Sequence, residues 1–370
     1  MKTINLTLRK ASMKHIIITF CLVILPYAVN AKILLEPALK AHIEQAVTAG
    51  QYQSVIIAYM QDGETVVKSF GTLVAGSDAT PNADTLFELS SNSKTFAATL
   101  LGIMAARGDV ALDDPVNMYL PQGVRIASFD GVDVTLQDLA THMSGLPLYP
   151  EDYAIDENDP TPHSEYSLDE LWASINAFKP TRKSGEKWLY SAFNFGVLSQ
   201  ALAHHMGKNY FSLVKEEILE PLDMTSTYLH LPDSERYRFA QGHLPGGEKT
   251  DNLIDHGALY AAGSMFTTVN DLLKFMRAHM SEGDSTIAEG IALTHPLYDT
   301  THGMGLGWEN TENSINRNHF GTGGGHRSYI GFNKDDPERR GVIIFTNTRS
   351  GIVDIGHHAL TSTHPLPDAE

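Results

Sequence analysis

Residues 87–97 read FELSSNSKTFA, and the interpretation of the whole chain starts from this stretch. An extended segment ends here, and the residues that follow predict an apolar helix that closes at Gly108. A helix begins with free N–H groups and a positive dipole end, and Lys94 lies one turn after Ser91, so the two share a face. A lysine within an apolar helix loses its proton more easily and can then act as a base for a serine nucleophile. The alternative is that Ser90 or Ser91 only caps the helix and that Lys94 reaches solvent.

The spacing Ser-x-x-Lys is a weak signal on its own, because it occurs at two further places in the chain. Ser184 and Lys187 lie in a polar loop, and Ser212 and Lys215 lie on an amphipathic segment where the serine is expected to face solvent. Of the three pairs, that at positions 91 and 94 directly follows an extended segment and opens a helix of buried character. It is therefore the candidate for catalysis.

The composition excludes one class of function. The chain has 370 residues, of which 42% are hydrophobic, as is ordinary for a soluble globular protein, and its formal net charge is −17. The sequence has no basic run of the kind that binds nucleic acid, so we expect no nucleic-acid partner.

Residues 1–31 have the pattern of a secretory signal peptide. A basic start without acids is followed by an apolar run at 15–29, and small residues at positions 29 and 31 predict cleavage after Ala31. The apolar run is short for a membrane span, although a single-span anchor is the alternative. The one cysteine, Cys21, lies within this segment, so the mature chain has no disulfide. We expect a periplasmic or secreted protein with no stable membrane anchor after cleavage.

The rest of the chain places strands at both ends and helices between them. Two strands over 54–71 meet at Asp62-Gly63, which is a strong hairpin signal. Two more strands are predicted at 327–333 and 340–347. Helices are predicted at 37–50, 93–108, 134–147, 167–178, 192–207, 209–224, 267–280 and 352–360. The terminal strands most simply share one sheet, with the helical middle inserted as a second region.

Several segments resemble, in the same order, those of the class C β-lactamases and the related penicillin-binding carboxypeptidases and esterases. FELSSNSKTFAATLLG at 87–102 resembles their nucleophile segment, KSGEKWLYSAFNFGVLSQAL at 183–202 the segment with the catalytic tyrosine, and HFGTGGGHRSYIGF at 319–332 the strand with the third motif. The resemblance covers most of residues 50–350. It implies an α/β fold of the β-lactamase/transpeptidase type, in which an antiparallel sheet formed by both chain ends is sandwiched by helices and an all-helical region is inserted. The hydrolase domain is expected over 32–370, with its α/β part at about 32–105 and 250–370 and its helical part at about 106–249.

The resemblance also implies roles for individual residues. Ser91 matches the acylating nucleophile, and Lys94 matches the lysine beside it. Tyr190 matches the tyrosine whose phenolate, or whose hydrogen-bond network with the lysine, moves the proton. The N–H groups of Ser91 and Gly324 match the oxyanion hole. The alternative for Tyr190 is a core aromatic residue at the start of a helix.

Two departures from the family's motifs affect how a substrate is held. The family's Tyr-x-Asn motif is Tyr190-Ser191-Ala192 in this chain, and Asn194 would point elsewhere on a helix. The third motif, usually Lys-Thr-Gly or His-Thr-Gly, is Gly321-Thr322-Gly323, so its cation is missing. The residues of acylation are therefore kept, while those that grip the substrate are changed.

Other residues are candidates for the missing contacts. His319 lies two positions before Gly321, on the same face of a strand, and His326, Arg327 and Arg349 are further candidates for the cation. An aromatic residue stands at position 149, where many lactamases carry glutamine, and it suits an apolar acyl group. The expected substrate-binding residues are Tyr149, Thr322, Gly323, His319 and Arg349.

We expect neither a metal nor a cofactor. The chain has 17 histidines but no H-E-x-x-H motif, and the pairs His204-His205 and His357-His358 are adjacent on helices, so their side chains diverge. The glycine-rich GTGGGH lacks the lysine and the strand–loop–helix order of a phosphate-binding loop. A nucleophile elbow of the form G-x-S-x-G is absent from the sequence.

Together these features predict a serine hydrolase that acts through an acyl-enzyme on β-lactams or on D-Ala-D-Ala-type cell-wall peptides. One alternative is a carboxylic ester hydrolase of the same fold, which the missing asparagine and lysine favour. The other alternative is not an enzyme but a penicillin- or peptidoglycan-binding protein with little turnover. The expected partner is a small-molecule or cell-wall peptide substrate, and the expected state is a monomer.

Overall fold

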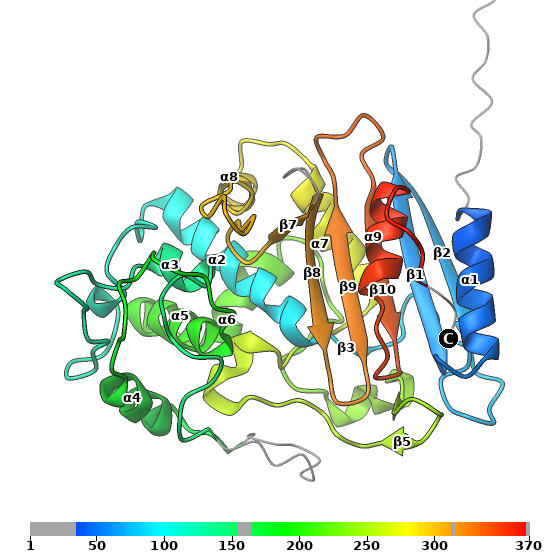
Figure 1. Ribbon diagram of the computed structural model, residues 1–370, viewed down its shortest axis with the longest axis horizontal. Coiled ribbons are helices and arrows are strands. Elements are labelled where there is room, and N and C mark those ends of the chain that lie inside the picture. The colour runs from blue at the N-terminus through cyan, green and yellow to red at the C-terminus, as the bar shows by residue number, and fades with distance from the viewer. Residues whose placement is uncertain (1–34, 154–164, 312–315, 368–370) are drawn as a thin grey trace, which may run out of the picture. The chain divides into compact units, whose positions relative to one another are not determined.

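The central sheet is antiparallel and is formed by both ends of the chain. The computed structural model describes residues 35–153, 165–311 and 316–367. Six strands lie in the order β2-β1-β10-β9-β8-β7 (Figure 1). Their bounds are Ser54–Gln61 (β1), Glu64–Gly71 (β2), Glu309–Thr311 (β7), Asn316–Thr322 (β8), Arg327–Phe332 (β9) and Gly341–Thr346 (β10). The predicted sheet shared by the two chain ends is confirmed.

The pairing of β1 explains how the two ends meet. On one side β1 forms the predicted hairpin with β2, and the turn residues Asp62 and Gly63 have φ of 51° and 84°, as a two-residue turn of this type requires. On the other side β1 pairs with β10, with Val55 opposite Thr346. Strands from the start and the end of the domain therefore lie side by side at the centre of the sheet.

Helices cover both faces of the sheet because the strand residues alternate between two apolar clusters. One face packs against α1 (Pro37–Thr48), which lies beside β1 and β2, and against α9 (Val353–Thr361), which lies over β9 and β10 (Figure 1). The other face packs against α2 (Ser93–Arg107) and α7 (Val269–Met280). All six residues of β10 are buried, as expected for a strand covered on both sides.

Most of the predicted helices are confirmed, with some changes of length. The helical region contains α3 (Leu136–Ala140), α4 (Leu168–Ala177), α5 (Ala192–Met206) and α6 (Tyr210–Val214), which continues as a π-helical turn at Lys215–Leu219. Capping boxes begin α3 at Thr135 and α4 at Ser167. The helix expected over 134–147 is only five residues long in the structure.

One helix was not predicted from the sequence. It is α8 (Thr286–Leu293), and a glycine in its last turns lowers its helix propensity. That glycine, Gly290, allows a close crossing with α2, where a Cβ on Gly102 would lie 2.2 Å from the Gly290 carbonyl oxygen. Tertiary packing therefore stabilises a helix that its own sequence indicates weakly.

Short two-stranded pairings connect the segments around the sheet. β3 (Phe87–Glu88) pairs with β6 (Phe266–Thr267), and β4 (Gly242–His243) pairs with β5 (Lys249–Thr250). Residues 33–370 form one compact unit, in which the α/β part and the helical part are not separated. The predicted signal peptide lies outside the described residues, and none of the described helices is long and apolar enough to cross a membrane.

Candidate active site

Ser91 lies in a sharp turn between a strand and a helix. After β3 the backbone of Ser90 adopts a left-handed conformation with φ of 51°, and a 3-10 turn at Ser90–Asn92 then leads into α2. No side-chain cap is formed at the start of this turn or of α2, and Lys94 is only 1% exposed. The alternative in which a serine caps the helix and Lys94 reaches solvent is therefore wrong.

The hydroxyl of Ser91 contacts both predicted partners. Lys94 Nζ lies 3.1 Å from Ser91 Oγ, and the Tyr190 hydroxyl donates to the same oxygen at 2.9 Å. Lys94 Nζ also donates to the carbonyl oxygen of Ala262 at 2.6 Å, which fixes the ammonium end of the side chain. Tyr190 lines the same cavity as Ser91, so the alternative of a core aromatic residue is excluded.

Burial gives Lys94 and Tyr190 different protonation states. It lowers the pKa of Lys94 to about 7, and the carboxylate of Glu309 opposes this shift. Burial raises the pKa of Tyr190 above its usual range, although the hydrogen bond with Ser91 lowers it in part. Near neutral pH a large fraction of Lys94 is therefore a free amine that can accept the Ser91 proton, while Tyr190 is a neutral phenol. A neutral Tyr190 is the form that donates to Ser91 in the observed hydrogen-bond network.

Two buried imidazoles lie close to Lys94 and are held neutral. Burial, with a smaller contribution from Lys94, lowers the pKa of His319 to about 3 and that of His142 well below its ordinary value. His142 accepts a hydrogen bond from the Ser191 N–H at 3.1 Å, and its ring packs 4.6 Å from that of Tyr190. The His142 ring therefore packs against the tyrosine, and neither imidazole adds positive charge beside the lysine.

The glycine turn after β8, at residues 323–325, packs closely against neighbouring backbone. Gly323 and Gly324 line the cavity with Ser91, and a Cβ on Gly324 would lie only 2.0 Å from the carbonyl oxygen of Asn252. The Gly323 N–H donates to the His326 carbonyl at 2.9 Å, which closes the turn. Only glycine fits at position 324, where the expected oxyanion N–H lies.

A buried carboxylate holds this turn in place. Glu88 Oε2 lies 2.8 Å from His326 Nδ1, and Glu88 Oε1 accepts the Ile254 N–H at 2.7 Å. The other ring nitrogen of His326 donates to the Ala240 carbonyl at 3.0 Å. Because Glu88 directly precedes the turn that carries Ser91, the segments on both sides of the oxyanion position are fixed relative to the nucleophile.

The cavity around Ser91 is about 700 Å³ and has an apolar wall and one exposed guanidinium. Tyr149 stacks on Tyr153 with ring centroids 4.8 Å apart, and Leu148 and Phe320 present exposed apolar surface. Thr322 and Arg349 also line the cavity. Tyr149, Thr322, Gly323 and Arg349 are therefore placed where the sequence analysis expected substrate contacts.

His319 does not lie where a substrate-binding cation is needed. It shares the buried face of β8 with Gly321, as expected, but it is 1% exposed, neutral and outside the cavity lining. His319 is thus corrected from a substrate contact to a buried residue of β8. A Cβ on Gly321 would lie 2.4 Å from the Leu89 carbonyl oxygen, so this strand position has no room for a side chain. Arg327 donates to the carbonyls of Gly323 and His326 and so braces the turn.

The asparagine missing from the tyrosine motif is not replaced from the same helix. Ala192 lines the cavity in its place. Asn194 is fully buried and accepts a hydrogen bond from Ser144 at 2.5 Å, so it points elsewhere, as expected.

Sequence reasoning missed three residues that shape the site: Glu88, His142 and Glu309. Glu309 follows the GLGW segment at the start of β7, and burial raises the pKa of its carboxyl while Lys94 lowers it. A glutamate after an apolar, glycine-rich stretch is only a weak sequence signal of an active-site residue. No spacing rule connects Glu309 to Ser91. These residues meet the site only through the tertiary fold.

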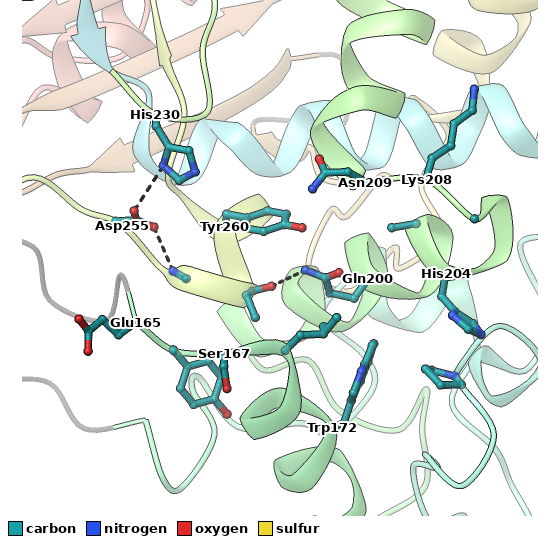
Figure 2. Close-up of a pocket in the computed structure, with 17 residues that line it drawn as sticks. Glu165, Ser167, Trp172, Gln200, His204, Lys208, Asn209, His230, Asp255 and Tyr260 are labelled. Atoms are coloured by element: carbon teal, nitrogen blue, oxygen red, sulfur yellow. Dashed lines mark hydrogen bonds and ion pairs between the residues drawn. The ribbon is translucent and has the colours of Figure 1, made fainter. Parts of the chain in front are cut away.

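A second cavity, of about 640 Å³, is lined by residues that include Trp172, Asp255 and Tyr260 (Figure 2). Residues 254–257 separate the two cavities by alternation. Asp255 and Gly257 line the second cavity, whereas Ile254 and His256 line the cavity of Ser91. Asp255 Oδ2 lies 3.4 Å from His230 Nδ1 (Figure 2), and Asp255 Oδ1 accepts the Gly257 N–H at 3.0 Å. This cavity holds none of the predicted catalytic residues.

The fold and the site of Ser91 define a serine hydrolase. A family model described as Beta-lactamase matches residues 39–360, which is most of the chain, so the chain belongs to the β-lactamase family.

Known relatives include a lactamase and a peptidase. A β-lactamase of Pseudomonas fluorescens is 31% identical over 260 residues, which cover 68% of each chain. The D-alanyl-D-alanine-carboxypeptidase/endopeptidase AmpH of Escherichia coli K12 is 27% identical over 229 residues, 61% of this chain and 57% of AmpH. The structure of a β-lactamase/D-alanine carboxypeptidase from Pseudomonas syringae has a TM-score of 0.75 at 21% identity, covering 89% of this chain and 100% of that one, and establishes the likeness of fold.

Proposed function

We propose that this protein hydrolyses D-Ala-D-Ala-type cell-wall peptides or β-lactams through an acyl-enzyme on Ser91. The observation that carries the proposal is the position of Ser91 Oγ, which lies between Lys94 Nζ at 3.1 Å and the Tyr190 hydroxyl at 2.9 Å on the wall of an open cavity. The names of the relatives, a β-lactamase and a D-alanyl-D-alanine peptidase, support the substrate class.

The proposed acylation moves one proton around this contact. Neutral Lys94 accepts the Ser91 proton as Oγ attacks the carbonyl carbon, and the N–H groups of Ser91 and Gly324 stabilise the oxyanion. When the C–N bond breaks, Tyr190 donates its proton to the leaving nitrogen and regains one from the Lys94 ammonium. A water molecule then attacks the acyl-enzyme, with the same two side chains handling its proton.

A carboxylic ester hydrolase is the second candidate, and the cavity wall favours it. Ala192 and Gly321 offer no amide or cation to grip a peptide substrate, while Tyr149, Leu148 and Phe320 suit an apolar acyl group. An ester also needs less help at its leaving group than an amide does. We further propose that the chain is exported and cleaved after Ala31.

Intact mass measured against time tests both candidates. The mature chain is mixed with a penicillin, in parallel with Ser91→Ala and with Ser212→Ala, which changes another Ser-x-x-Lys serine as a control. An adduct of the penicillin's mass is expected in the wild type and in Ser212→Ala and not in Ser91→Ala. Decay of the adduct with product indicates a β-lactamase, and a lasting adduct indicates a penicillin-binding protein or a slow peptidase. Turnover of aryl esters without any adduct would replace the cell-wall proposal with the ester hydrolase.

A further inference from the structure

Three potential metal ligands meet on the sheet face that lies opposite α2. Asp354 and His357 stand three residues apart on α9, so they share a side of that helix, and His364 comes from the segment that follows it. The donor atoms of the three side chains all lie within 4.8 Å of one another. Asp354 Oδ1 is 3.1 Å from His364 Nε2, and the rings of His357 and His364 are 5.3 Å apart at 83°.

The backbone around His364 is held in position. Ser362 has φ of 58° at the end of α9, and this left-handed residue turns the chain back along the helix. The His364 carbonyl accepts a hydrogen bond from His358 Nδ1 at 2.6 Å, and its N–H donates to Thr361 Oγ1 at 3.2 Å. His358 Nε2 in turn lies 3.1 Å from Glu36 Oε2. These contacts fix the backbone of His364 and so set the place from which its imidazole reaches Asp354 and His357.

The donor set matches one class of ion. Two imidazoles and one carboxylate suit Zn²⁺ and other divalent first-row transition ions, whereas Ca²⁺ and Mg²⁺ prefer oxygen ligands. Ligand atoms of a tetrahedral zinc ion lie about 3.4 Å apart, so no pair within 4.8 Å would have to approach by more than about 1.4 Å. Asp354 is exposed and both histidines are partly exposed, so an ion could enter from solvent with water as its fourth ligand.

We propose that Asp354, His357 and His364 form a binding site for Zn²⁺, which fastens the segment after α9 to that helix. The sequence predicts no metal site here, because His357 and His358 are adjacent on a helix and their side chains diverge. The structure agrees that they diverge, since His358 bonds to the His364 carbonyl while His357 faces the cluster. The third ligand comes from a reversal of the chain that no sequence motif indicates. The proposal is independent of catalysis at Ser91.

Metal titration of the chelator-treated chain, after removal of any affinity tag, tests the proposal. Zn²⁺ is titrated by calorimetry, and Co²⁺ is used as a probe whose visible absorption reports coordination. The variants are Asp354→Asn and His364→Ala, with His204→Ala as the control, because His204 is an exposed helical histidine elsewhere.

We expect one saturable Zn²⁺ site, at least tenfold weaker in both ligand variants and unchanged in His204→Ala. Zinc should also raise the melting temperature of the wild type by a few degrees, and this rise should be lost in the two variants. Absence of saturable binding, or equal affinity in the wild type and both ligand variants, would overturn the proposal.

Discussion

The carboxylate of Glu88 lies 2.8 Å from Nδ1 of His326, and both side chains are buried. Through the same carboxylate, β3 is joined to the glycine turn and to the backbone of Ile254. We predict that Glu88→Gln destabilises the protein by about 1–3 kcal/mol, because the amide presents one acceptor oxygen where the carboxylate presents one each to His326 and to the Ile254 N–H. The substitution should also lower kcat at least tenfold, because the Gly324 N–H is no longer held in its position relative to Ser91. Unfolding curves and ester turnover measure the two effects, and Glu248→Gln, at an exposed position, should change neither.

The rate of acylation should depend on the protonation of Lys94. With a pKa of about 7, the lysine becomes a competent base as the pH rises, so kcat/KM should increase through about pH 7. The Glu309 carboxylate favours the ammonium form of Lys94. Glu309→Gln should therefore lower the pKa of Lys94 and shift the rise in kcat/KM to lower pH. A profile of kcat/KM against pH for a neutral aryl ester measures both. If kcat/KM of Glu309→Gln rises at the same pH as that of the wild type, a group other than Lys94 controls the rise.

The glycine turn should not tolerate even one added methyl group at position 324. A Cβ there would lie 2.0 Å from the Asn252 carbonyl oxygen, which is a backbone atom and cannot rotate away. We predict that Gly324→Ala lowers kcat at least 100-fold, the order of magnitude seen when one oxyanion donor is removed. Gly351→Ala is the matched control, since a Cβ on Gly351 has no neighbour within 4 Å. Circular dichroism and melting curves separate a local loss from unfolding.

Arg349 should select substrates by charge. Its side chain is exposed and lines the cavity, whereas Arg327 is committed to the carbonyls of the turn. We expect Arg349→Ala to raise KM several-fold for substrates with a carboxylate and to leave neutral esters unchanged. Paired kinetics on a carboxylate-bearing ester and its methyl ester make the comparison. Equal losses on both would assign Arg349 a structural role.

Acid should destabilise the fold through a buried pair of histidines. His279 Nδ1 lies 3.0 Å from His295 Nε2, and burial, with Arg317 and Lys334 nearby, lowers the pKa of His279 to about 3 and that of His295 further. Below about pH 6.5 the unfolded chain takes up protons that the folded pair does not, so stability should fall as the pH falls. The slope is at most about 1.4 kcal/mol per pH unit for each histidine.

Melting temperatures between pH 7.5 and 5 test this dependence. His279→Gln should give a flatter curve than the wild type. The variant His204→Ala, at an exposed position, should keep the wild-type slope.

The fold and the grouping of side chains around Ser91 could both be predicted from the sequence. Three features depend on local spacing, which can be read directly from a sequence. They are the hairpin turn at Asp62-Gly63, the helix after Ser91, and the contact of Ser91 with Lys94. The predicted partners Tyr190 and Gly324 also lie on the same cavity as Ser91.

The supporting residues could not be predicted in the same way. Glu88 and His326 are far apart in the chain, and their contact depends on packing. The expectation for His319 failed for a related reason: strand periodicity gives the face of a side chain correctly but does not say which face borders the cavity. The same limit applies to Glu309, whose influence on Lys94 is electrostatic and is not carried by any motif.

The pairing of β1 with β10 has a consequence for how the enzyme is made. Val55 is opposite Thr346, so the middle of the sheet cannot close until almost the whole domain has been synthesised. Contacts between such distant segments form late and slowly, because the intervening chain must first be ordered. Ser91, the proposed nucleophile, is thus translated early, but Gly324, its proposed oxyanion partner, joins the site only when the final strands arrive. An incomplete chain therefore carries the nucleophile without the ability to use it.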